Sequence, residues 1–268
     1  MPPYPQKEFY PVANVKEKAW PFKIKAKENN DTLAILAHGF TSSPGAMADL
    51  ADFLAQNGVD VEAVLLAGHG GDLDALAKAS HHDWISSFEK VLAANLDKYK
   101  NIFLIGYSLG ANVAVYLANK YPRINGLVVF GAPIYIRKEK LAKFFLPFYQ
   151  FLRIKTWKKM WLNADDLEQM SAIGSQTDIP IRSIVEFYNF ISDHSKKNIK
   201  EFARPILLAH SRFDNVSEPY SSQFIFSQIK STDKELYILG KNSHGIFHKN
   251  RHDFLFKKIL SFIRKRSY

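Results

Sequence analysis

The chain has 268 residues, of which 47% are hydrophobic and 23% charged, values typical of a globular protein with a sizeable core. It contains no cysteine, which excludes disulfides, thiolate metal sites and a cysteine nucleophile and is compatible with a reducing compartment. The formal net charge is +10 and is concentrated in residues 137–159 and at the C-terminal end, but no aromatic–basic nucleic-acid motif accompanies it, so we expect no nucleic-acid partner.

The N-terminus and the hydropathy of the chain bear on its location. No run of about 18 uncharged apolar residues occurs, so we expect no membrane-spanning helix. The segment MPPYPQKEFYPV is polar and proline-rich and lacks the apolar core of a signal peptide. We therefore expect a cytoplasmic protein, and weak contact of its basic segment with a membrane surface is compatible with the charge.

Short apolar runs alternate with helical stretches along most of the chain. The runs cover residues 32–37, 59–66, 101–105, 126–130, 205–210 and 235–239, and residues 22–26 are a candidate edge strand. Helical patterns lie near residues 45–57, 82–98, 109–120, 218–229 and 253–265. Continuous apolar runs are typical of strands covered on both faces. The alternation predicts an α/β fold with a mostly parallel central sheet flanked by helices.

The alternation stops between residues 135 and 203, where no strand is predicted. This segment has helical patterns over KLAKFFLPFYQFL, around residues 164–173 and around residues 181–192. Because it interrupts the strand–helix alternation, we interpret it as a helical cap inserted between the sixth and seventh strands of the fold, within a single domain of residues 1–268. Phe144, Phe145 and Phe148 predict an acyl-binding pocket or a lipid-facing lid, and packing of a cap helix on the core is the structural alternative.

The sequence Gly106-Tyr107-Ser108-Leu109-Gly110 matches G-x-S-x-G. An apolar strand precedes it and the helix-forming run LGANVAVYLANKYP follows, which is the strand–turn–helix setting of a nucleophile elbow. Strained backbone at such a turn projects the serine hydroxyl above the sheet, and a Cβ at either outer glycine would collide with neighbouring backbone. We therefore predict that Ser108 is a catalytic nucleophile.

A tetrahedral intermediate needs two backbone amide donors for its oxyanion. The first is expected from Leu109, directly after the nucleophile, and the second from Phe40 in the loop HGFTSSP that follows residues 32–37. We expect His38 to pack within this loop rather than take part in catalysis. His69, in the later loop GHGG, is expected to shape the rim of the pocket.

The acid and the base are selected by the chain order of this fold, which is serine, then aspartate or glutamate, then histidine. Asp214 follows the strand at residues 205–210, and His244 follows the last predicted strand and precedes a glycine. A histidine suits the role of base because its pKa lies near neutrality, and a buried aspartate fixes the ring tautomer. We therefore predict the triad Ser108, Asp214 and His244.

Together these residues resemble the small bacterial carboxylesterases and monoacylglycerol lipases of the α/β-hydrolase superfamily. HGFTSSP is similar to the oxyanion loop of that family, AGHGG to its second-strand loop, HHDWISS to the following helix start and GAPIYIRKEK to the entry of its cap. The similarity extends from Leu33 to Phe262. It implies the α/β-hydrolase fold, a small helical cap over the site and no cofactor.

The favoured function is that of a serine carboxylesterase that hydrolyses short- to medium-chain acyl esters through an acyl-enzyme intermediate. A monoacylglycerol lipase, or a thioesterase, amidase or peptidase, could use the same triad, because a fold does not fix the substrate. A non-catalytic binding protein on this scaffold would be expected to have a broken triad. His248 and His252 are spaced i, i+4, but no carboxylate cluster completes a site, so we expect no metal.

Overall fold

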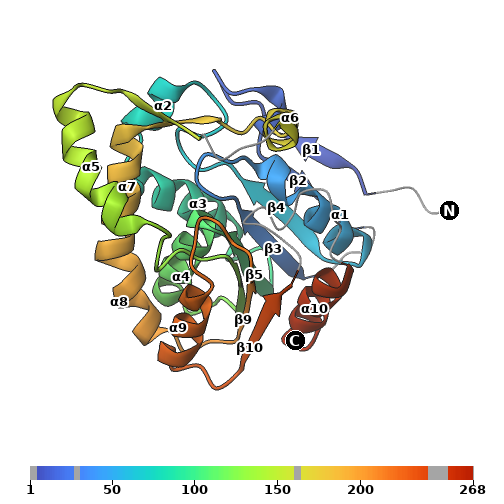
Figure 1. Cartoon of the computed structure of the whole chain (residues 1–268). Helices are drawn as coiled ribbons and strands as arrows, with labels where there is room; N and C mark the ends of the chain where they lie inside the picture. Colours follow the sequence, from blue (N-terminus) through green and yellow to red (C-terminus); the bar gives the residue numbers. More distant parts are fainter. Residues whose placement is uncertain (1–4, 27–30, 160–163, 241–252, 268) are drawn as a thin grey trace.

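A single eight-stranded sheet runs through the part of the chain that the structure describes, with helices on both faces (Figure 1). The computed structural model describes residues 5–26, 31–159, 164–240 and 253–267. Along the sheet the strand order is β1-β2-β4-β3-β5-β6-β9-β10. The pairs β1–β2 and β2–β4 are antiparallel and the others are parallel, which confirms the predicted mostly parallel sheet. The strands are β1 (Lys7–Phe9), β2 (Phe22–Ile24), β3 (Thr32–Ala37), β4 (Asp60–Val64), β5 (Asn101–Tyr107), β6 (Gly126–Phe130), β9 (Ile206–Ser211) and β10 (Lys234–Leu239).

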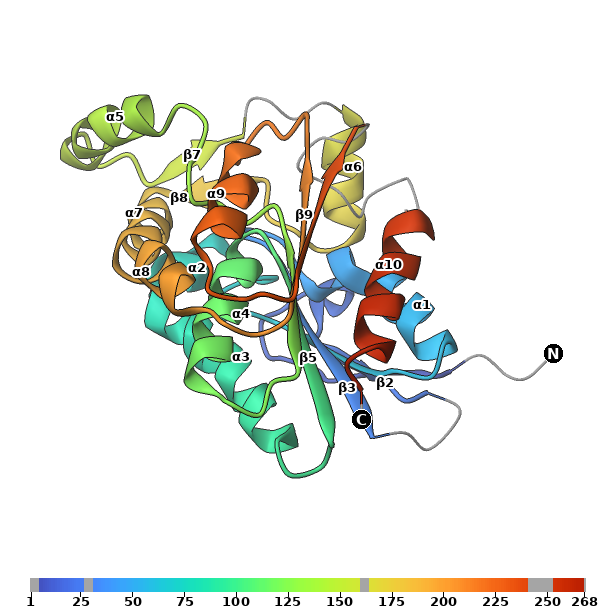
Figure 2. The same ribbon diagram turned by 90° about the horizontal axis from the view of Figure 1, so that it is seen from below.

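Two helical layers cover the sheet (Figure 2). Helices α1 (Ala48–Gln56) and α10 (Asp253–Arg264) pack on one face, and α3 (His81–Asn95), α4 (Leu109–Lys120) and α9 (Tyr220–Gln228) pack on the other. Within β5, Phe103 and Ile105 belong to the core under α1 and α10, whereas Ile102 and Leu104 belong to the opposite core. Because side chains alternate between the faces of a strand and both faces are buried, the strand reads as a continuous apolar run.

The edge of the sheet differs from the prediction. Residues 22–26 were predicted as an edge strand, but β2 is the second strand, with β1 outside it. Helix α2 (Leu73–Lys78) was not predicted either. Both β1 and α2 are short, and β1 is largely exposed, so neither produces an apolar period that a sequence pattern can reveal.

The segment between β6 and β9, which are the sixth and seventh strands of the sheet along the chain, is called the insert here (residues 135–203). It contains α5 (Glu139–Phe151), α6 (Ala164–Ala172), α7 (Ile181–Phe190), a π-helical turn (Ile191–Ser195), α8 (Lys196–Asn198) and a 3₁₀ turn (Ile199–Glu201). The prediction of no strand here is wrong, because β7 (Thr156–Lys158) and β8 (Asp178–Pro180) form a two-stranded antiparallel ribbon. Each of these strands has only three residues, too few for a recognisable alternation.

The carboxyl ends of the parallel strands determine where a site can form. The loops after β3, β4, β5, β6 and β9 all leave from this edge, where α/β proteins bind their ligands. Two further 3₁₀ turns, Glu17–Ala19 and Pro44–Met47, lie in the connections. Among the helices of the described residues, none has the length and apolarity needed to cross a membrane.

Candidate active site

Ser108 occupies a strained turn between β5 and α4. Its φ of 52° and ψ of −118° place a residue with a Cβ in a region that normally suits glycine. The Ser108 N–H donates to the carbonyl of Phe130 at 2.8 Å, which ties the turn to the end of β6. The side chain is 4% exposed, so the hydroxyl lies within the protein. This is the geometry that the G-x-S-x-G pattern predicts.

The two glycines of the motif have no room for a side chain. An ideal Cβ on Gly106 would lie 2.3 Å from Cα of Ala111, and one on Gly110 would lie 2.3 Å from the carbonyl oxygen of Ala37. These are backbone atoms, so no side-chain rotation can relieve the contact. The predicted need for glycine at both positions is confirmed, and the close approach brings the end of β3 against the start of α4.

The predicted oxyanion loop lies against this elbow. The Gly110 N–H donates to the carbonyl of His38 at 3.1 Å, and a Cβ on Gly39 would meet Cβ of Ser108 at 3.1 Å. Phe40 follows directly, and its ring stacks on Phe187 of α7 with centroids 5.0 Å apart and planes within 6°. Leu109 is the first residue of α4, whose N-terminal amides carry a partial positive charge. The roles of the Phe40 and Leu109 amides stay predictions.

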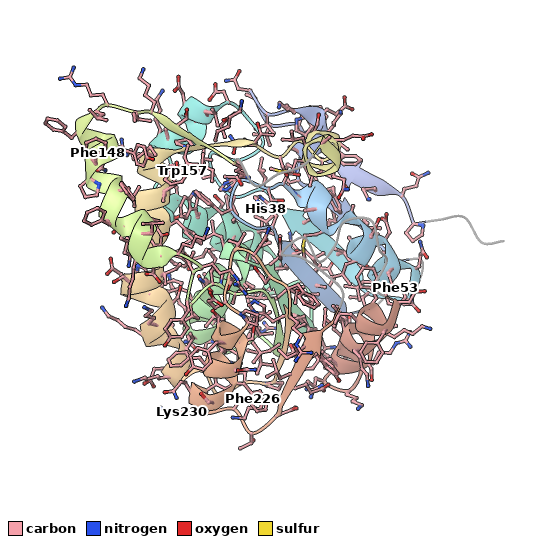
Figure 3. All side chains as sticks on the ribbon, in the orientation of Figure 1. His38, Phe53, Phe148, Trp157, Phe226 and Lys230 are labelled. Atoms are coloured by element: carbon pink, nitrogen blue, oxygen red, sulfur yellow. The ribbon has the colours of Figure 1, made fainter. Side chains whose placement is uncertain are left out.

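His38 is a structural histidine at the centre of the molecule (Figure 3). It is fully buried, its Nε2 accepts from the Leu66 N–H at 3.1 Å, and its Nδ1–H therefore donates to the carbonyl of Gly39 at 2.9 Å. Burial lowers the pKa of His38 well below the usual range, so the ring is neutral. It joins the loop after β3 to the loop after β4, in keeping with the predicted packing role.

His69 lies beside it, with ring centroids 5.0 Å apart. Its Nδ1 is 3.1 Å from the carbonyl of Ala67, and burial lowers its pKa to about 4. Its Nε2 is buried and has no hydrogen-bond partner among the described residues. His69 is therefore a neutral residue with its second ring nitrogen available as an acceptor.

Asp214 lies in the loop after β9 and is 1% exposed. Its Oδ1 accepts from the backbone amides of Val216 and Ser217, each at 2.8 Å, and its Oδ2 lies 3.2 Å from Nε2 of His210. These donors fix the carboxylate rigidly. Arg137, near the start of the insert, donates through Nε to the backbone carbonyl of Asp214 at 2.7 Å, so the insert also holds this loop.

His210, in β9, lies against the carboxylate of Asp214. It is fully buried; its Nδ1 is 2.7 Å from the hydroxyl of Ser222 and its Nε2 faces Asp214. Both ring nitrogens are engaged, so His210 is not placed to take a proton from Ser108. The sequence feature that could have indicated this contact is a histidine four residues before an aspartate, at the end of a predicted strand.

His244 lies outside the described residues, as do His248 and His252. Strand β10, which precedes His244 in the chain, pairs with β9 in register Leu239↔Ser211, and the Arg212 N–H donates to the carbonyl of Leu239 at 2.8 Å. The chain therefore leaves β10 beside the loop that carries Asp214. The role of His244 as base stays a prediction.

The three predicted substrate-binding phenylalanines lie on the outer side of α5. Phe144, Phe145 and Phe148 are 75%, 39% and 55% exposed, and Leu146 is the buried residue of the helix. Figure 3 shows Phe148 at the periphery. Helix α5 packs on α7, where the Lys143 ammonium lies 5.0 Å from the ring centroid of Tyr188. Acyl binding by these residues stays a prediction.

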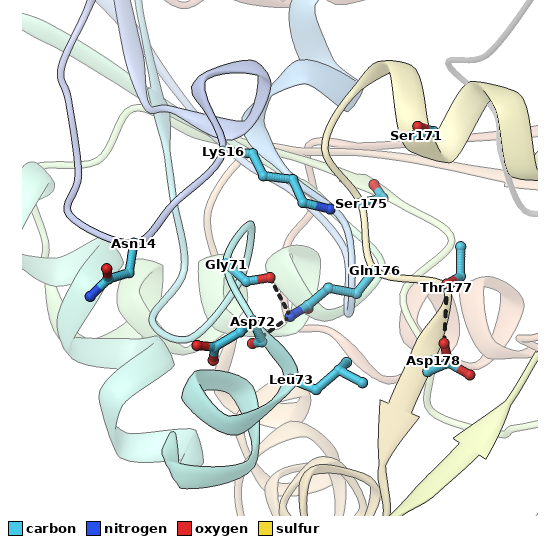
Figure 4. Close-up of a pocket in the computed structure, with 10 residues that line it drawn as sticks. All are labelled: Asn14, Lys16, Gly71, Asp72, Leu73, Ser171, Ser175, Gln176, Thr177 and Asp178. Carbon is cyan, nitrogen blue, oxygen red and sulfur yellow. Dashed lines mark hydrogen bonds between the residues drawn. The ribbon is translucent and has the colours of Figure 1, made fainter.

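A polar pocket of about 540 Å³ lies between the N-terminal segment, the loop before α2 and the insert (Figure 4). Lys16, Asp72, Ser175 and Gln176 contribute to its lining, and the Gln176 side-chain amide donates to the carbonyl of Asp72 at 3.1 Å. Of the predicted catalytic and oxyanion residues that the structure describes, namely Ser108, Asp214, Phe40 and Leu109, none lines this pocket. Over the described ranges, no cluster of three or more His, Cys, Asp or Glu side chains is arranged to hold a metal ion.

A family profile and two characterised proteins match most of the chain. The profile of the family described as "Serine aminopeptidase, S33" matches residues 28–251. A thermostable monoacylglycerol lipase of Bacillus sp. (strain H-257) is 28% identical over 237 residues, which cover 88% of this chain and 90% of that protein. A carboxylesterase of Bacillus subtilis (strain 168) is 23% identical over 252 residues, which cover 91% and 96%.

Solved structures show the same fold. A structure from work on LipS and LipT, two metagenome-derived lipolytic enzymes, has a TM-score of 0.81 at 23% identity and covers 94% of this chain and 99% of that chain. A soluble variant of monoglyceride lipase from Saccharomyces cerevisiae, in complex with a substrate analogue, has a TM-score of 0.78 at 17% identity and covers 100% and 99%. The predicted α/β-hydrolase fold is confirmed.

Proposed function

Because the chain belongs to the family described as "Serine aminopeptidase, S33", within the α/β-hydrolase superfamily, we propose that it is a serine carboxylesterase acting on short- to medium-chain acyl esters. Its relatives include a carboxylesterase and a monoacylglycerol lipase, and ester hydrolysis is the activity they share. The observation that carries the proposal is Ser108, held at positive φ between β5 and α4 with the loop after β3 packed against it.

The proposed reaction has two steps. The Ser108 hydroxyl attacks the ester carbonyl carbon while His244 takes its proton, and the amides of Phe40 and Leu109 stabilise the oxyanion. The alcohol leaves with the proton from His244, and a water activated by the same histidine then attacks the acyl-enzyme and releases the acid. Asp214 orients the ring and stabilises the imidazolium, a role that its own donors support by fixing the carboxylate.

Substitution of the nucleophile tests this proposal. Ser108→Ala is expected to reduce hydrolysis of p-nitrophenyl butyrate to the background rate of the buffer. Ser86→Ala is the matched control, because Ser86 is an exposed serine of α3 and should leave the rate unchanged. Equal, above-background rates for wild type and Ser108→Ala would refute the assignment. A wild-type protein without any hydrolytic activity would favour the binding-protein alternative.

The class of bond is tested with matched leaving groups. One acyl group presented as an ester, a thioester and an amide separates a carboxylesterase from a thioesterase, amidase or peptidase. A series of p-nitrophenyl esters from acetate to palmitate, together with monoacylglycerols, measures chain-length preference. We expect the highest kcat/KM for short to medium acyl esters, and a maximum at monoacylglycerols with long acyl chains would instead identify a monoacylglycerol lipase.

The insert is proposed to cap the site and to make weak contact with an anionic membrane surface, in a protein located in the cytoplasm. Residues 137–158 contain seven exposed lysines and arginines but one acidic residue. The same stretch exposes Phe144, Phe148 and Phe151, the last of them by 82%. An amphipathic helix that exposes aromatic side chains and has cationic residues within it and on both flanks suits the interface of a lipid bilayer.

Sedimentation with vesicles separates the two roles of these aromatic residues. Binding to vesicles that contain phosphatidylglycerol, but not to pure phosphatidylcholine, and its loss in high salt are expected of a charge-dependent surface. The variant Phe144→Ser/Phe148→Ser should lose this binding while hydrolysing p-nitrophenyl butyrate normally. If instead its KM for this soluble ester rises and vesicle binding is unchanged, the phenylalanines line the acyl pocket.

A further inference from the structure

The insert holds the proposed oxyanion loop through several hydrogen bonds. The Gln176 N–H donates to the carbonyl of Thr41 at 2.9 Å, and the Ser43 hydroxyl donates to the carbonyl of Ile173. The Gln176 side-chain amide also reaches the carbonyls of the loop before α2. Residues 173–176 of the insert and residues 41–43 therefore form one hydrogen-bonded unit beside the elbow.

Lys159, directly after β7, makes two hydrogen bonds that join the two parts of this unit. Its ammonium donates to the hydroxyl of Thr41 at 2.5 Å and to the carbonyl of Gln176 at 2.9 Å. The Thr41 hydroxyl donates its own hydrogen to the carbonyl of Phe40 at 2.6 Å, so it must accept from the lysine. A continuous chain of donors thus runs from Lys159 through Thr41 to the carbonyl of Phe40.

The backbone at this position needs such support. Thr41 has a φ of 60°, which is an unfavourable conformation for a β-branched residue. Such a conformation persists only where surrounding contacts impose it. It directly follows Phe40, whose amide is the proposed oxyanion donor. Relaxation of Thr41 would rotate the peptide group that carries the Phe40 carbonyl, and this rotation would be passed through Phe40 to the neighbouring peptide group that carries the Phe40 N–H.

We propose that Lys159 is a positioning residue for ester hydrolysis, which holds the Phe40 amide in its oxyanion-binding orientation through Thr41 and makes this orientation depend on the docked insert. This inference rests on the proposed serine esterase function. It assigns to the insert a part in transition-state stabilisation in addition to covering the substrate. Lys159 does not contact the reacting atoms, and its effect is expected in kcat rather than in KM.

The environment of Lys159 gives the proposal a pH signature. Burial of the ammonium lowers the pKa of Lys159 to about 7, and the carboxylate of Asp178 opposes this shift. The titratable groups that face it are Asp178 of β8 and His69 of the loop after β4, and His69 stays neutral above its own pKa of about 4. Raising the pH through 7 therefore removes the charge that strengthens the hydrogen bond to Thr41.

The experiment compares Lys159→Met, which keeps the length of the side chain but has no donor, with Lys159→Arg, which keeps a donor. Lys158→Met is the matched control, since Lys158 is exposed on β7. We expect Lys159→Met to lower kcat for p-nitrophenyl butyrate by on the order of 10²-fold with KM unchanged, as for a displaced oxyanion donor. Lys159→Arg should retain most of kcat, and Lys158→Met all of it.

The pH profile of kcat supplies a readout that a merely structural role would not change. The wild type should lose activity by a few-fold above pH 7, and Lys159→Arg should not, because arginine stays charged. Thr41→Val removes the acceptor with little change of shape, and its effect on kcat should not add to that of Lys159→Met. Thr41→Val therefore also tests the proposal if Lys159→Met fails to fold.

The outcomes separate this inference from the proposed function. Wild-type kcat and pH profile in Lys159→Met and in Thr41→Val, with Ser108→Ala inactive, overturn the role of Lys159 alone. Equal losses in Lys158→Met and Lys159→Met, or a rise in KM without a fall in kcat, overturn it as well. Activity that survives Ser108→Ala overturns both.

Discussion

Replacing Gly106 by alanine perturbs the elbow at its tightest point. The added Cβ would lie 2.3 Å from Cα and 2.5 Å from N of Ala111, and 2.5 Å from the carbonyl oxygen of Gly110. Carbon atoms in contact prefer a separation of about 3.5 Å, so the backbones must part by roughly 1 Å. All three atoms belong to the backbone of the first turn of α4, so the helix itself has to move away from β5.

This shift displaces Ser108, which joins the two elements. A misplacement of about 1 Å costs on the order of 10² in rate, and a forced fit in a packed interior costs about 1–3 kcal/mol of stability. We therefore expect Gly106→Ala to lose at least about 10²-fold in kcat/KM. Its melting temperature should fall by several degrees, since roughly 2–4 °C correspond to 1 kcal/mol in a protein near this size.

Gly58→Ala is the control for this prediction. Gly58 has a φ of 87°, and an added Cβ would meet nothing within 4 Å, so the substitution strains the backbone without a collision. It should cost about 1 kcal/mol of stability and leave kcat/KM unchanged. The assays are hydrolysis of p-nitrophenyl butyrate and thermal unfolding followed by circular dichroism. Wild-type kcat/KM in Gly106→Ala, or an equal loss in Gly58→Ala, would refute the reasoning.

Three further predictions concern the buried polar groups. Asp214→Asn should lower kcat by roughly 10⁴-fold with little change in KM, and a loss below about tenfold would exclude Asp214 as the triad acid. His210→Phe removes one hydrogen-bond partner from the hydroxyl of Ser222 and one from the carboxylate of Asp214, and it should cost about 1–3 kcal/mol in urea unfolding; unchanged stability contradicts the hydrogen bonds described. Acidification should destabilise the protein, because the unfolded chain protonates its histidines near pH 6.5 while burial holds the pKa of His69 at about 4. Stability is therefore lost as the pH falls below 6.5, by about 2 kcal/mol from His69 at pH 5, and His69→Gln should lack this part of the loss.

The sequence predicts the core elements well where continuous burial imposes a pattern. The bounds of β3, β6 and α4 agree with the predicted residues 32–37, 126–130 and 109–120. Their side chains are buried on both sides of the sheet or under the insert, so nearly every position is apolar. Strand β1 pairs with β2, and β7 pairs with β8; each of these strands has only three residues, too few to show an apolar alternation in the sequence.

The residues of the candidate site also differ in whether a local sequence pattern predicts them. The strained turn at Ser108 is predictable because a local motif imposes it, and the place of Asp214 after β9 because a recognisable strand precedes it; their catalytic roles stay predictions. The contact of Lys159 with Thr41 joins residues 118 positions apart and depends on the fold of the insert, so no local sequence motif predicts it. His244 is predicted by chain order alone.

Mapping the adduct of a fluorophosphonate probe by peptide mass spectrometry tests the central claim most directly. The probe reacts covalently with a serine that a neighbouring base has activated. We predict a single adduct on the peptide that contains Ser108, formed in proportion to the loss of esterase activity and absent in Ser108→Ala. An adduct on another serine, or full activity after complete modification of Ser108, would contradict this account.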